Sequence, residues 1–269
     1  MGGYVALPLE IPAEVAADLR QLEPLFAVAR QVHALGQRLH TDLDLPERSA
    51  LQAVAYVMFG KAFRTVQSIA ALCLCGFGVD ALSLCGSLFE NLVDLSYMEK
   101  APVLRPRRYT QFEQVEKFYQ AERVLAHKRL RKGLRERYRG YHNHLKPQVA
   151  NLLRYFPKKH LGWAQLSQKQ RAKAVGMDIE YEELYWIFCG YKHTLPAAAH
   201  GLVIEDGQNV DVLVGPSAAG VFDALAFGLR YTLHLFGLAA KIHGLHIEAE
   251  IDGIAAAYID ACEQVRQQP

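Results

Sequence analysis

Two apolar stretches of this sequence carry polar side chains whose spacing could support chemistry. The first is the segment 83–94, in which Glu90 and Asp94 are four residues apart. On a helix this spacing places both carboxylates on one face, close to the apolar positions that would face a core. A carboxylate in such a place needs a partner or a proton. The pair therefore indicates an acid/base or ligand position or, alternatively, a hydrogen-bonding stripe between helices.

The second stretch, residues 185–201, combines a thiol with two imidazoles. Cys189 and His193 are four residues apart, and His200 follows seven residues later. A neighbouring imidazole can activate a thiolate, so Glu90, Cys189 and His193 are candidate catalytic residues. The alternative for the histidine is a buried ring that hydrogen-bonds to the backbone.

Carboxylates combined with imidazoles would also suit a metal ion such as Zn, Fe or Mn. The alternative ligand set is Glu90, Asp94, His193 and His200, which would make the protein a metal-dependent hydrolase. A glycine-rich phosphate loop, an HExxH helix and a Gly-x-Ser-x-Gly elbow are absent from the sequence. The sequence thus indicates no cofactor, and it leaves open whether the protein is an enzyme.

A basic segment occupies the middle of the chain. Residues 105–159 hold sixteen Lys and Arg against four Glu and no Asp, whereas the remaining residues hold 14 basic and 24 acidic side chains. This asymmetry favours contact with phosphate backbones, and the interleaved Tyr138, Tyr141 and His142 could stack on bases. The alternatives are a solvated helical hairpin and a basic patch that meets an acidic patch in the fold, on another subunit or on an acidic protein partner. The residues predicted to contact nucleic acid are Lys128, Arg129, Arg131, Lys132, Arg135, Arg137 and Arg139.

Within this segment, four residues separate Arg139 from His144. This spacing resembles the ribonuclease motif of helical HEPN domains, in which an Arg and a His on a helix at a dimer interface act on RNA phosphates. The resemblance implies Arg139 and His144 as catalytic residues of a ribonuclease. The glycine that directly follows Arg139 departs from a regular helical sequence.

The elements that must position these residues are almost all helical. The apolar periodicity predicts an all-α bundle of seven to eight helices in one domain over residues 1–269, and the segment 202–214 is either a short β-hairpin or a loop. Residues 215–269 are expected to pack as C-terminal helices on the rest. The predicted helices are 11–40, 47–76, 80–99, 107–130, 134–156, 180–195, 217–245 and 247–267.

The composition of the chain indicates its class and its cellular compartment. The chain has 269 residues, 51% of them hydrophobic and 22% charged, which suits one globular domain. Its longest apolar run, residues 69–79, is too short to span a bilayer, so no membrane contact is expected. The five cysteines show no zinc-knuckle spacing and mostly lie in apolar surroundings, which predicts reduced thiols in a cytoplasmic protein.

Three pieces of the sequence carry a family resemblance. They are the helix 81–97 with Glu90, the connector 163–176 with its spaced Trp, Ser, Ala and Gly, and the stretch 181–193 with Tyr, Tyr, Cys and His at intervals of four. In order and spacing these pieces resemble the bacterial domain-of-unknown-function family 5677, over about residues 50–201, and more distantly HEPN-like domains. Two positions depart from the family pattern, because Gly86 stands where the family has Arg and Cys189 where it has Ser.

The missing Arg weakens a nuclease role for the Glu90 and His193 helices. We therefore expect an uncharacterised HEPN-like helical module that is non-catalytic, forms a homo-oligomer such as a dimer, and binds a partner through the basic hairpin. That partner is RNA or an acidic protein. The alternative is an enzyme, either a ribonuclease or a metal-dependent hydrolase.

Overall fold

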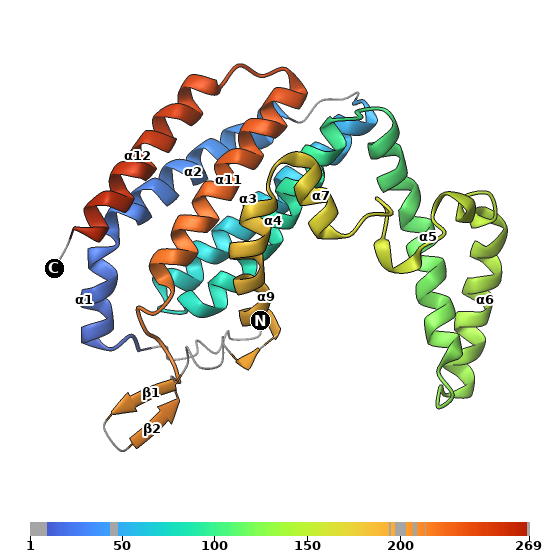
Figure 1. The fold of residues 1–269 in the computed structure, drawn as a ribbon, viewed down its shortest axis with the longest axis horizontal. Helices are drawn as coiled ribbons and strands as arrows, with labels where there is room; N and C mark the ends of the chain where they lie inside the picture. The colour runs from blue at the N-terminus through green and yellow to red at the C-terminus, as the bar shows by residue number, and fades with distance from the viewer. Residues whose placement is uncertain are drawn as a thin grey trace, which may run out of the picture.

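A computed structural model describes residues 10–43, 48–193, 195–196, 203–206, 209–212 and 214–267 (Figure 1). The fold is all-α, as expected, with one short pair of strands. The helices are α1 (Ala13–Gln21), α2 (Glu23–Asp42), α3 (Ala50–Leu74), α4 (Gly78–Glu99), α5 (Leu104–Ala126), α6 (Lys132–Val149), α7 (Gln168–Val175), α8 (Asp178–Glu180), α9 (Trp186–His193), α11 (Val221–His243) and α12 (Glu248–Arg266). Short turns of helix are η1 (Leu153–Tyr155), η2 (Lys159–Leu161) and the π-helical η3 (Tyr181–Tyr185).

The centre of the bundle is formed by α3, α4 and α11, which pack against one another. Helices α2 and α12 cover one side, and α7 and α9 cover the other side of α4 (Figure 1). Phe59, Phe89 and Phe236 are among the largest fully buried side chains, and the rings of Phe59 and Phe236 lie 4.9 Å apart. Helices that are apolar on most sides, such as α4 and α11, are those that lie deepest.

Helix α3 has the length and composition of a helix that could cross a membrane. It packs between α4, α11 and α2, and the core helices of soluble proteins have the same composition. Its start is set by a capping box, in which Ser49 Oγ accepts from the Gln52 amide and the Gln52 side chain accepts from the Ser49 amide.

The single helix predicted over residues 11–40 is divided in two. Helix α1 ends at Gln21, Leu22 leaves helical geometry with φ −89° and ψ 5°, and α2 begins at Glu23 with Pro24 in its first turn. Proline has no amide hydrogen and favours the first turn of a helix over its interior. This break, together with the short helices after residue 167, gives the described chain more helical segments than the seven or eight expected.

Two glycines, Gly76 and Gly78, let the turn between α3 and α4 pack closely against the start of α11. The Ser217 amide donates to the Gly76 carbonyl at 2.8 Å. A Cβ atom at Gly78 would lie 2.2 Å from the backbone nitrogen of Val221, so no larger residue fits there. Two segments just over 140 residues apart in sequence are thus held in contact at this end of the bundle.

Helices α5 and α6 form an arm that projects from the bundle (Figure 1). The arm has its own small core, separate from the main one, built from Val115, Phe118, Tyr119, Leu145, Val149 and Phe156. The Tyr119 hydroxyl donates to the Phe156 carbonyl at 3.1 Å, which ties α5 to the chain after α6. The arm is therefore held mainly by contacts within itself.

The remaining described segments are short. Strand β1 (Val203–Asp206) pairs antiparallel with β2 (Asn209–Val212), with Val203 opposite Val212, in the segment for which the sequence left a hairpin or a loop open. All five cysteines are free thiols. The sequence likewise predicts reduced thiols.

Candidate functional site

Glu90 lies at the contact between α4 and the continuous helical segment 178–193, which we call the α8–α9 helix. The Tyr185 hydroxyl donates to Glu90 Oε1 at 2.5 Å, and both side chains are half-buried. Burial raises the pKa of Tyr185, and the hydrogen bond to the Glu90 carboxylate raises it further. Tyr185 therefore stays protonated near neutral pH and acts as a donor to the carboxylate. Sequence reasoning did not identify this partner, although Tyr185 belongs to the spaced tyrosine pattern.

Gly86 lets the α8–α9 helix approach α4 closely. A Cβ atom at Gly86 would lie 3.1 Å from Cβ of Phe188, a side chain that is fully buried. The Cβ atom of an Arg in this position would press on Phe188, which would have to shift by a few tenths of an ångström. We call this contact, with Gly86, Glu90, Tyr185 and Phe188, the α4–α9 seam.

Cys189 and His193 do not form a reactive pair in the described residues. The Cys189 thiol is half-buried beside Tyr185, whereas the His193 side chain is exposed. Within residues 48–193 no hydrogen bond joins His193 to Glu90 or to Cys189. The structure thus brings Glu90 and Cys189 together around Tyr185, and it leaves His193 at the surface.

Asp94, one turn after Glu90, holds the connector that carries the spaced Trp and Ser. Arg171 Nε donates to Asp94 Oδ1 at 2.6 Å, and Trp163 Nε1 donates to Asp94 Oδ2 at 3.3 Å. Burial raises the pKa of Asp94, and the opposing effect of the Arg171 charge is smaller. Each carboxylate oxygen of Asp94 accepts one of these hydrogen bonds. Asp94 therefore holds α7 and the preceding connector against α4.

The other spaced residues of the connector also have local structural roles. Ser167 starts α7 with a capping box to Gln170, Ala172 is fully buried, and Gly176 ends the helix with φ 81°. The resemblance in this region therefore reflects how α7 is started, packed and ended.

The alternative metal set is only partly within the described residues. Glu90, Asp94 and His193 are described, and His200 lies outside the described part of the chain. Among the described residues no group of three or more His, Cys, Asp or Glu could hold a metal ion. That set stays a prediction.

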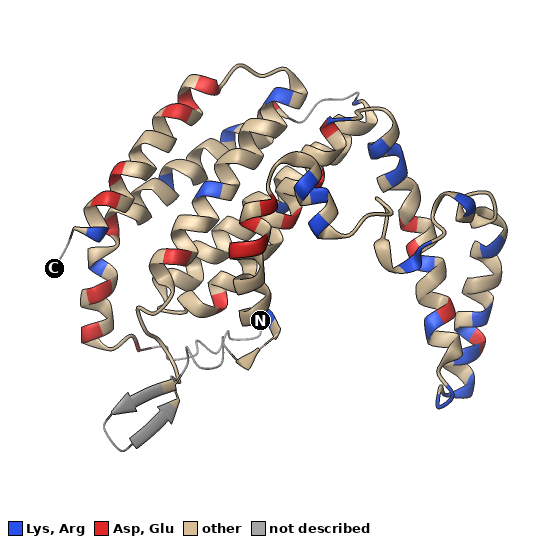
Figure 2. Ribbon diagram, in the orientation of Figure 1, with Lys and Arg blue, Asp and Glu red and all other residues tan. Residues whose placement is uncertain are grey.

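On the arm, most cations predicted to contact nucleic acid are exposed. The side chains of six of the seven make no hydrogen bond or ion pair to any described residue: Lys128, Arg129, Arg131, Lys132, Arg137 and Arg139. Figure 2 shows many Lys and Arg and fewer Glu along the arm, and Asp and Glu on helices of the bundle such as α12. The arm thus presents cations whose side chains have no acidic partner in the part of the chain that the structure describes.

Arg135 is the exception among the seven. Its guanidinium donates to the carbonyls of Leu125, His127 and Lys128 at 3.1, 3.0 and 3.3 Å. These carbonyls end α5 and begin the turn, so Arg135 stabilises the hairpin from within. Sequence composition could not separate this structural Arg from its exposed neighbours.

A groove runs along one face of α6, beside Gln120 of α5. It has a volume of about 590 Å³ and is lined by Leu134, Arg137, Tyr138, Gly140, Tyr141 and His144. The Leu134 and Tyr141 side chains remain 43% and 40% exposed. The third aromatic residue predicted to stack on bases, His142, instead stacks on Phe118 with ring centroids 4.7 Å apart. An aromatic and cationic groove of this kind can hold a flat ring and a phosphate together.

The predicted ribonuclease pair does not share this groove. His144 lines it and accepts from Gln148 Nε2 at 3.0 Å, whereas Arg139 is exposed and does not line it. Five residues on an α-helix turn the side-chain direction by about 140°. The two side chains therefore lie on different faces of α6.

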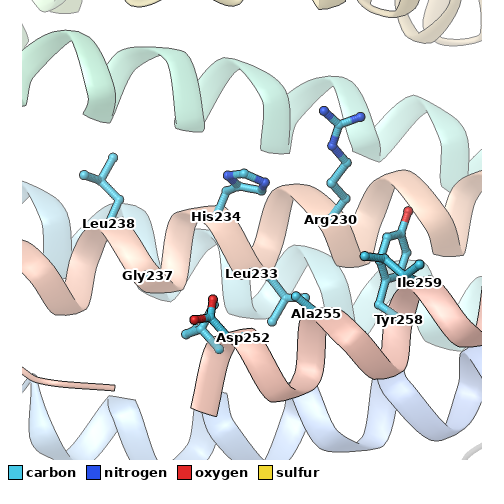
Figure 3. Close-up of a pocket in the computed structure, with 10 residues that line it drawn as sticks. Arg230, Leu233, His234, Gly237, Leu238, Asp252, Ala255, Tyr258 and Ile259 are labelled. Atoms are coloured by element: carbon cyan, nitrogen blue, oxygen red, sulfur yellow. The ribbon is translucent and has the colours of Figure 1, made fainter. Parts of the chain in front are cut away.

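A second groove, of about 570 Å³, lies between α11 and α12 (Figure 3). Arg230 and His234 rise from the same side of α11, Asp252 and Tyr258 come from α12, and apolar residues such as Leu233 line it. Arg230 pairs with Glu180 at 3.3 Å, and burial lowers the pKa of His234. The groove mixes cations and anions and favours no single class of charged ligand.

A match to a known protein family covers the region from α3 to the strands. Residues 52–210 match a family of unknown function, DUF5677, close to the range of about 50–201 over which the sequence resembles it. No curated protein and no solved structure matches the chain. Since the match spans more than half of the 269 residues and includes the arm, the α4–α9 seam and the connector, this protein belongs to the DUF5677 family.

Proposed function

We propose that this protein is a non-catalytic, cytoplasmic helical module that binds single-stranded RNA through its arm. The observation that carries the proposal is the group of six exposed cations on the arm that have no partner in the described chain. Cations free of intramolecular carboxylates can replace the counterions of a phosphate backbone at little cost. The proposed kinship with HEPN domains rests on the sequence resemblance of the Glu90 and His193 helices.

The groove on α6 favours RNA over an acidic protein as the partner. Tyr138 and Tyr141 line it together with Arg137, and base stacking on an aromatic ring is worth about 1–3 kcal/mol per base. An acidic peptide would use the cations but would gain nothing comparable from the rings. Unpaired bases are accessible only in single strands, so a single strand is the ligand that uses both features.

The seam supports the non-catalytic part of the proposal. Glu90 and Asp94 have donors from Tyr185, Trp163 and Arg171, which leaves them little freedom to exchange protons with a substrate. On the arm, Arg139 and His144 point to different sides of α6. One chain therefore does not bring Arg139 and His144 together over a single bound phosphate.

The test is binding of a fluorescent single-stranded RNA to the full chain, measured by anisotropy. The triple variant Lys132→Gln, Arg137→Gln, Arg139→Gln should bind at least about tenfold more weakly. The matched control Arg20→Gln, Arg64→Gln, Lys173→Gln removes the same charge from exposed sites off the arm and should bind as the wild type does.

Equal weakening in both triple variants would contradict the proposal, because the effect would then follow net charge alone. Binding of polyglutamate in place of RNA would assign the arm to an acidic protein partner. Cleavage of the RNA that His144→Ala abolishes would replace the non-catalytic proposal with the ribonuclease alternative.

A further inference from the structure

A polar cavity lies on the surface of the bundle, where α3 packs against α4. It has a volume of about 460 Å³, and Leu84 of α4 lines it on one side. The other residues that line it all come from α3: Val57, Gly60, Lys61, Arg64, Thr65 and Ser68. They follow one another at intervals of three and four, so they share one face of the helix. The cavity is separate from the arm and from both grooves described above.

Two cations in this cavity have no acidic partner. Lys61 and Arg64 are both exposed, and neither side chain forms an ion pair within the described residues. None of the residues that line the cavity is acidic. Cβ atoms three residues apart on a helix are about 5–6 Å from each other, so one small anion can contact both side chains.

Two hydroxyl groups lie next to these cations. Thr65 Oγ1 donates to the Lys61 carbonyl at 2.8 Å, and Ser68 Oγ donates to the Arg64 carbonyl at 3.0 Å. Both carbonyls are inside α3, where they also accept from backbone amides. Each hydroxyl can therefore rotate and donate to a bound anion without leaving a carbonyl unsatisfied.

Asn91 of α4 is a buried polar residue whose hydrogen bonds the fold satisfies only in part. Its Oδ1 atom accepts from Lys61 Nζ at 3.3 Å, which holds the ammonium group towards α4. The residue is only 6% exposed, and its side-chain nitrogen has no hydrogen-bond partner among the described residues. Buried donors without a partner are rare in folded proteins. Beside two cations that lack acidic partners, this one indicates a site that an outside acceptor completes.

We propose that this cavity binds the phosphate group of a small phosphate monoester. Such a group carries a charge of about −1.5 to −2 at neutral pH, which matches two cations that reach one point. The guanidinium of Arg64, the ammonium of Lys61 and the two hydroxyls offer more donors than the two oxygens of a carboxylate can use, whereas a phosphate monoester presents three. An RNA strand carries single charges spaced along its length, which suits the arm better than this cavity.

The end of the cavity one turn before the cations fits the organic part of the ester. Val57 is 65% exposed there, and a Cβ atom at Gly60 would meet no other atom within 4 Å. The glycine thus leaves open space beside an apolar side chain, so we infer a ligand with a small apolar or aromatic group attached to its phosphate. The proposal goes beyond RNA binding and does not depend on it.

The first test is thermal denaturation of the full chain in inorganic phosphate, with sodium chloride at the same ionic strength as the reference. A ligand that binds only the folded chain raises the Tm by mass action. Phosphate should therefore raise the Tm of the wild type, and Lys61→Gln and Arg64→Gln should each bind it at least about tenfold more weakly, because each removes one charged donor. Arg20→Gln is the matched control, since it removes an exposed cation from α1 and should respond as the wild type does. A wild type with the same Tm in phosphate and in chloride, or an Arg64→Gln variant with the wild-type response, would overturn the proposal.

The second test uses phenyl phosphate to probe the apolar end of the cavity. It should bind the wild type at least about fivefold more tightly than inorganic phosphate does, because its ring covers Val57 and fills the space at Gly60. Gly60→Leu fills this space with its own side chain. That variant should still bind inorganic phosphate but should bind phenyl phosphate no more tightly, and circular dichroism should show it folded. A wild type without preference for phenyl phosphate, or a Gly60→Leu variant that keeps the whole preference, would contradict the assignment of a monoester to this cavity.

Discussion

At the α4–α9 seam and the connector beside it, the carboxylates have partners from distant parts of the chain. Tyr185 reaches Glu90 across 95 residues of sequence, and Arg171 reaches Asp94 across 77. On the arm, six cations have no partner among the described residues. Polar groups that satisfy one another stabilise a fold, whereas exposed groups of one sign without partners repel one another until an outside ligand neutralises them. The difference suggests that the seam is built for structure and the arm for binding.

Among these substitutions, Asp94→Ala should show the difference between the seam and the arm most clearly, because it should lower the free energy of unfolding the most. Asp94→Ala leaves the Arg171 guanidinium and the Trp163 N–H without their shared acceptor in a place that is mostly buried. We expect a loss of about 3 kcal/mol in the free energy of unfolding, as for other buried pairs that lose one member. Urea denaturation measures it, with the exposed Asp252→Ala as control. A loss below about 0.5 kcal/mol, the range of ordinary surface substitutions, would show that Asp94 is not a structural anchor.

Substitution of Gly86 tests how tightly the seam is packed. Gly86→Leu would push against Cβ of Phe188 and should cost about 2 kcal/mol, in the range for overpacked cores. Gly60→Leu is the matched control, because a Cβ atom at Gly60 of α3 meets no other atom within 4 Å. That control should be neutral or slightly stabilising, since leucine favours a helix more than glycine does. Equal effects at both positions would mean that the seam has room for a side chain.

Removal of the Tyr185 hydroxyl should have a smaller effect on stability. Tyr185→Phe keeps the ring against Phe89, with centroids 5.5 Å apart, and deletes only the donor to Glu90. The expected cost is about 1 kcal/mol in the free energy of unfolding, the usual value for one hydrogen bond in a half-buried place. If the variant is as stable as the wild type, the pair is not structural, and Glu90 becomes available for other chemistry.

The smallest effect on stability is expected on the arm. Arg137→Gln removes a cation that has no partner in the described residues, so the free energy of unfolding should change by less than about 0.5 kcal/mol. Arg135→Gln deletes the donor to three carbonyls and should cost about 1 kcal/mol. Thermal denaturation followed by circular dichroism compares the two. Equal costs would erase the distinction between structural and exposed arginines on the arm.

Periodicity and family resemblance predicted the helices and the extent of the family well. Helices such as α3, α4 and α11 have long apolar faces, and the connector with Ser167 and Gly176 has local caps that can be read from neighbouring residues. The break before Pro24 was missed, because proline in a first turn looks like proline in a helix when only periodicity is considered.

The candidate site was predicted less completely. Glu90 and Asp94 lie close to the core, as their place on an apolar helix predicts, but their partners Tyr185, Trp163 and Arg171 are contributed by tertiary packing over long sequence separations. Composition likewise identified the basic arm without distinguishing Arg135, which is bonded to the turn, from Arg137, which lines the groove. Local sequence carries no direct record of such contacts.

The claim that the arm is built for binding is tested most directly by the salt dependence of RNA binding. Anisotropy titrations of a single-stranded RNA at several salt concentrations give the slope of log affinity against log salt for the wild type and for the triple variant Lys132→Gln, Arg137→Gln, Arg139→Gln. Each cation that contacts a phosphate contributes about 0.7 to this slope, so the variant should lose about 2. An unchanged slope would contradict the account, because the arm's free cations would then not be the groups that hold the RNA.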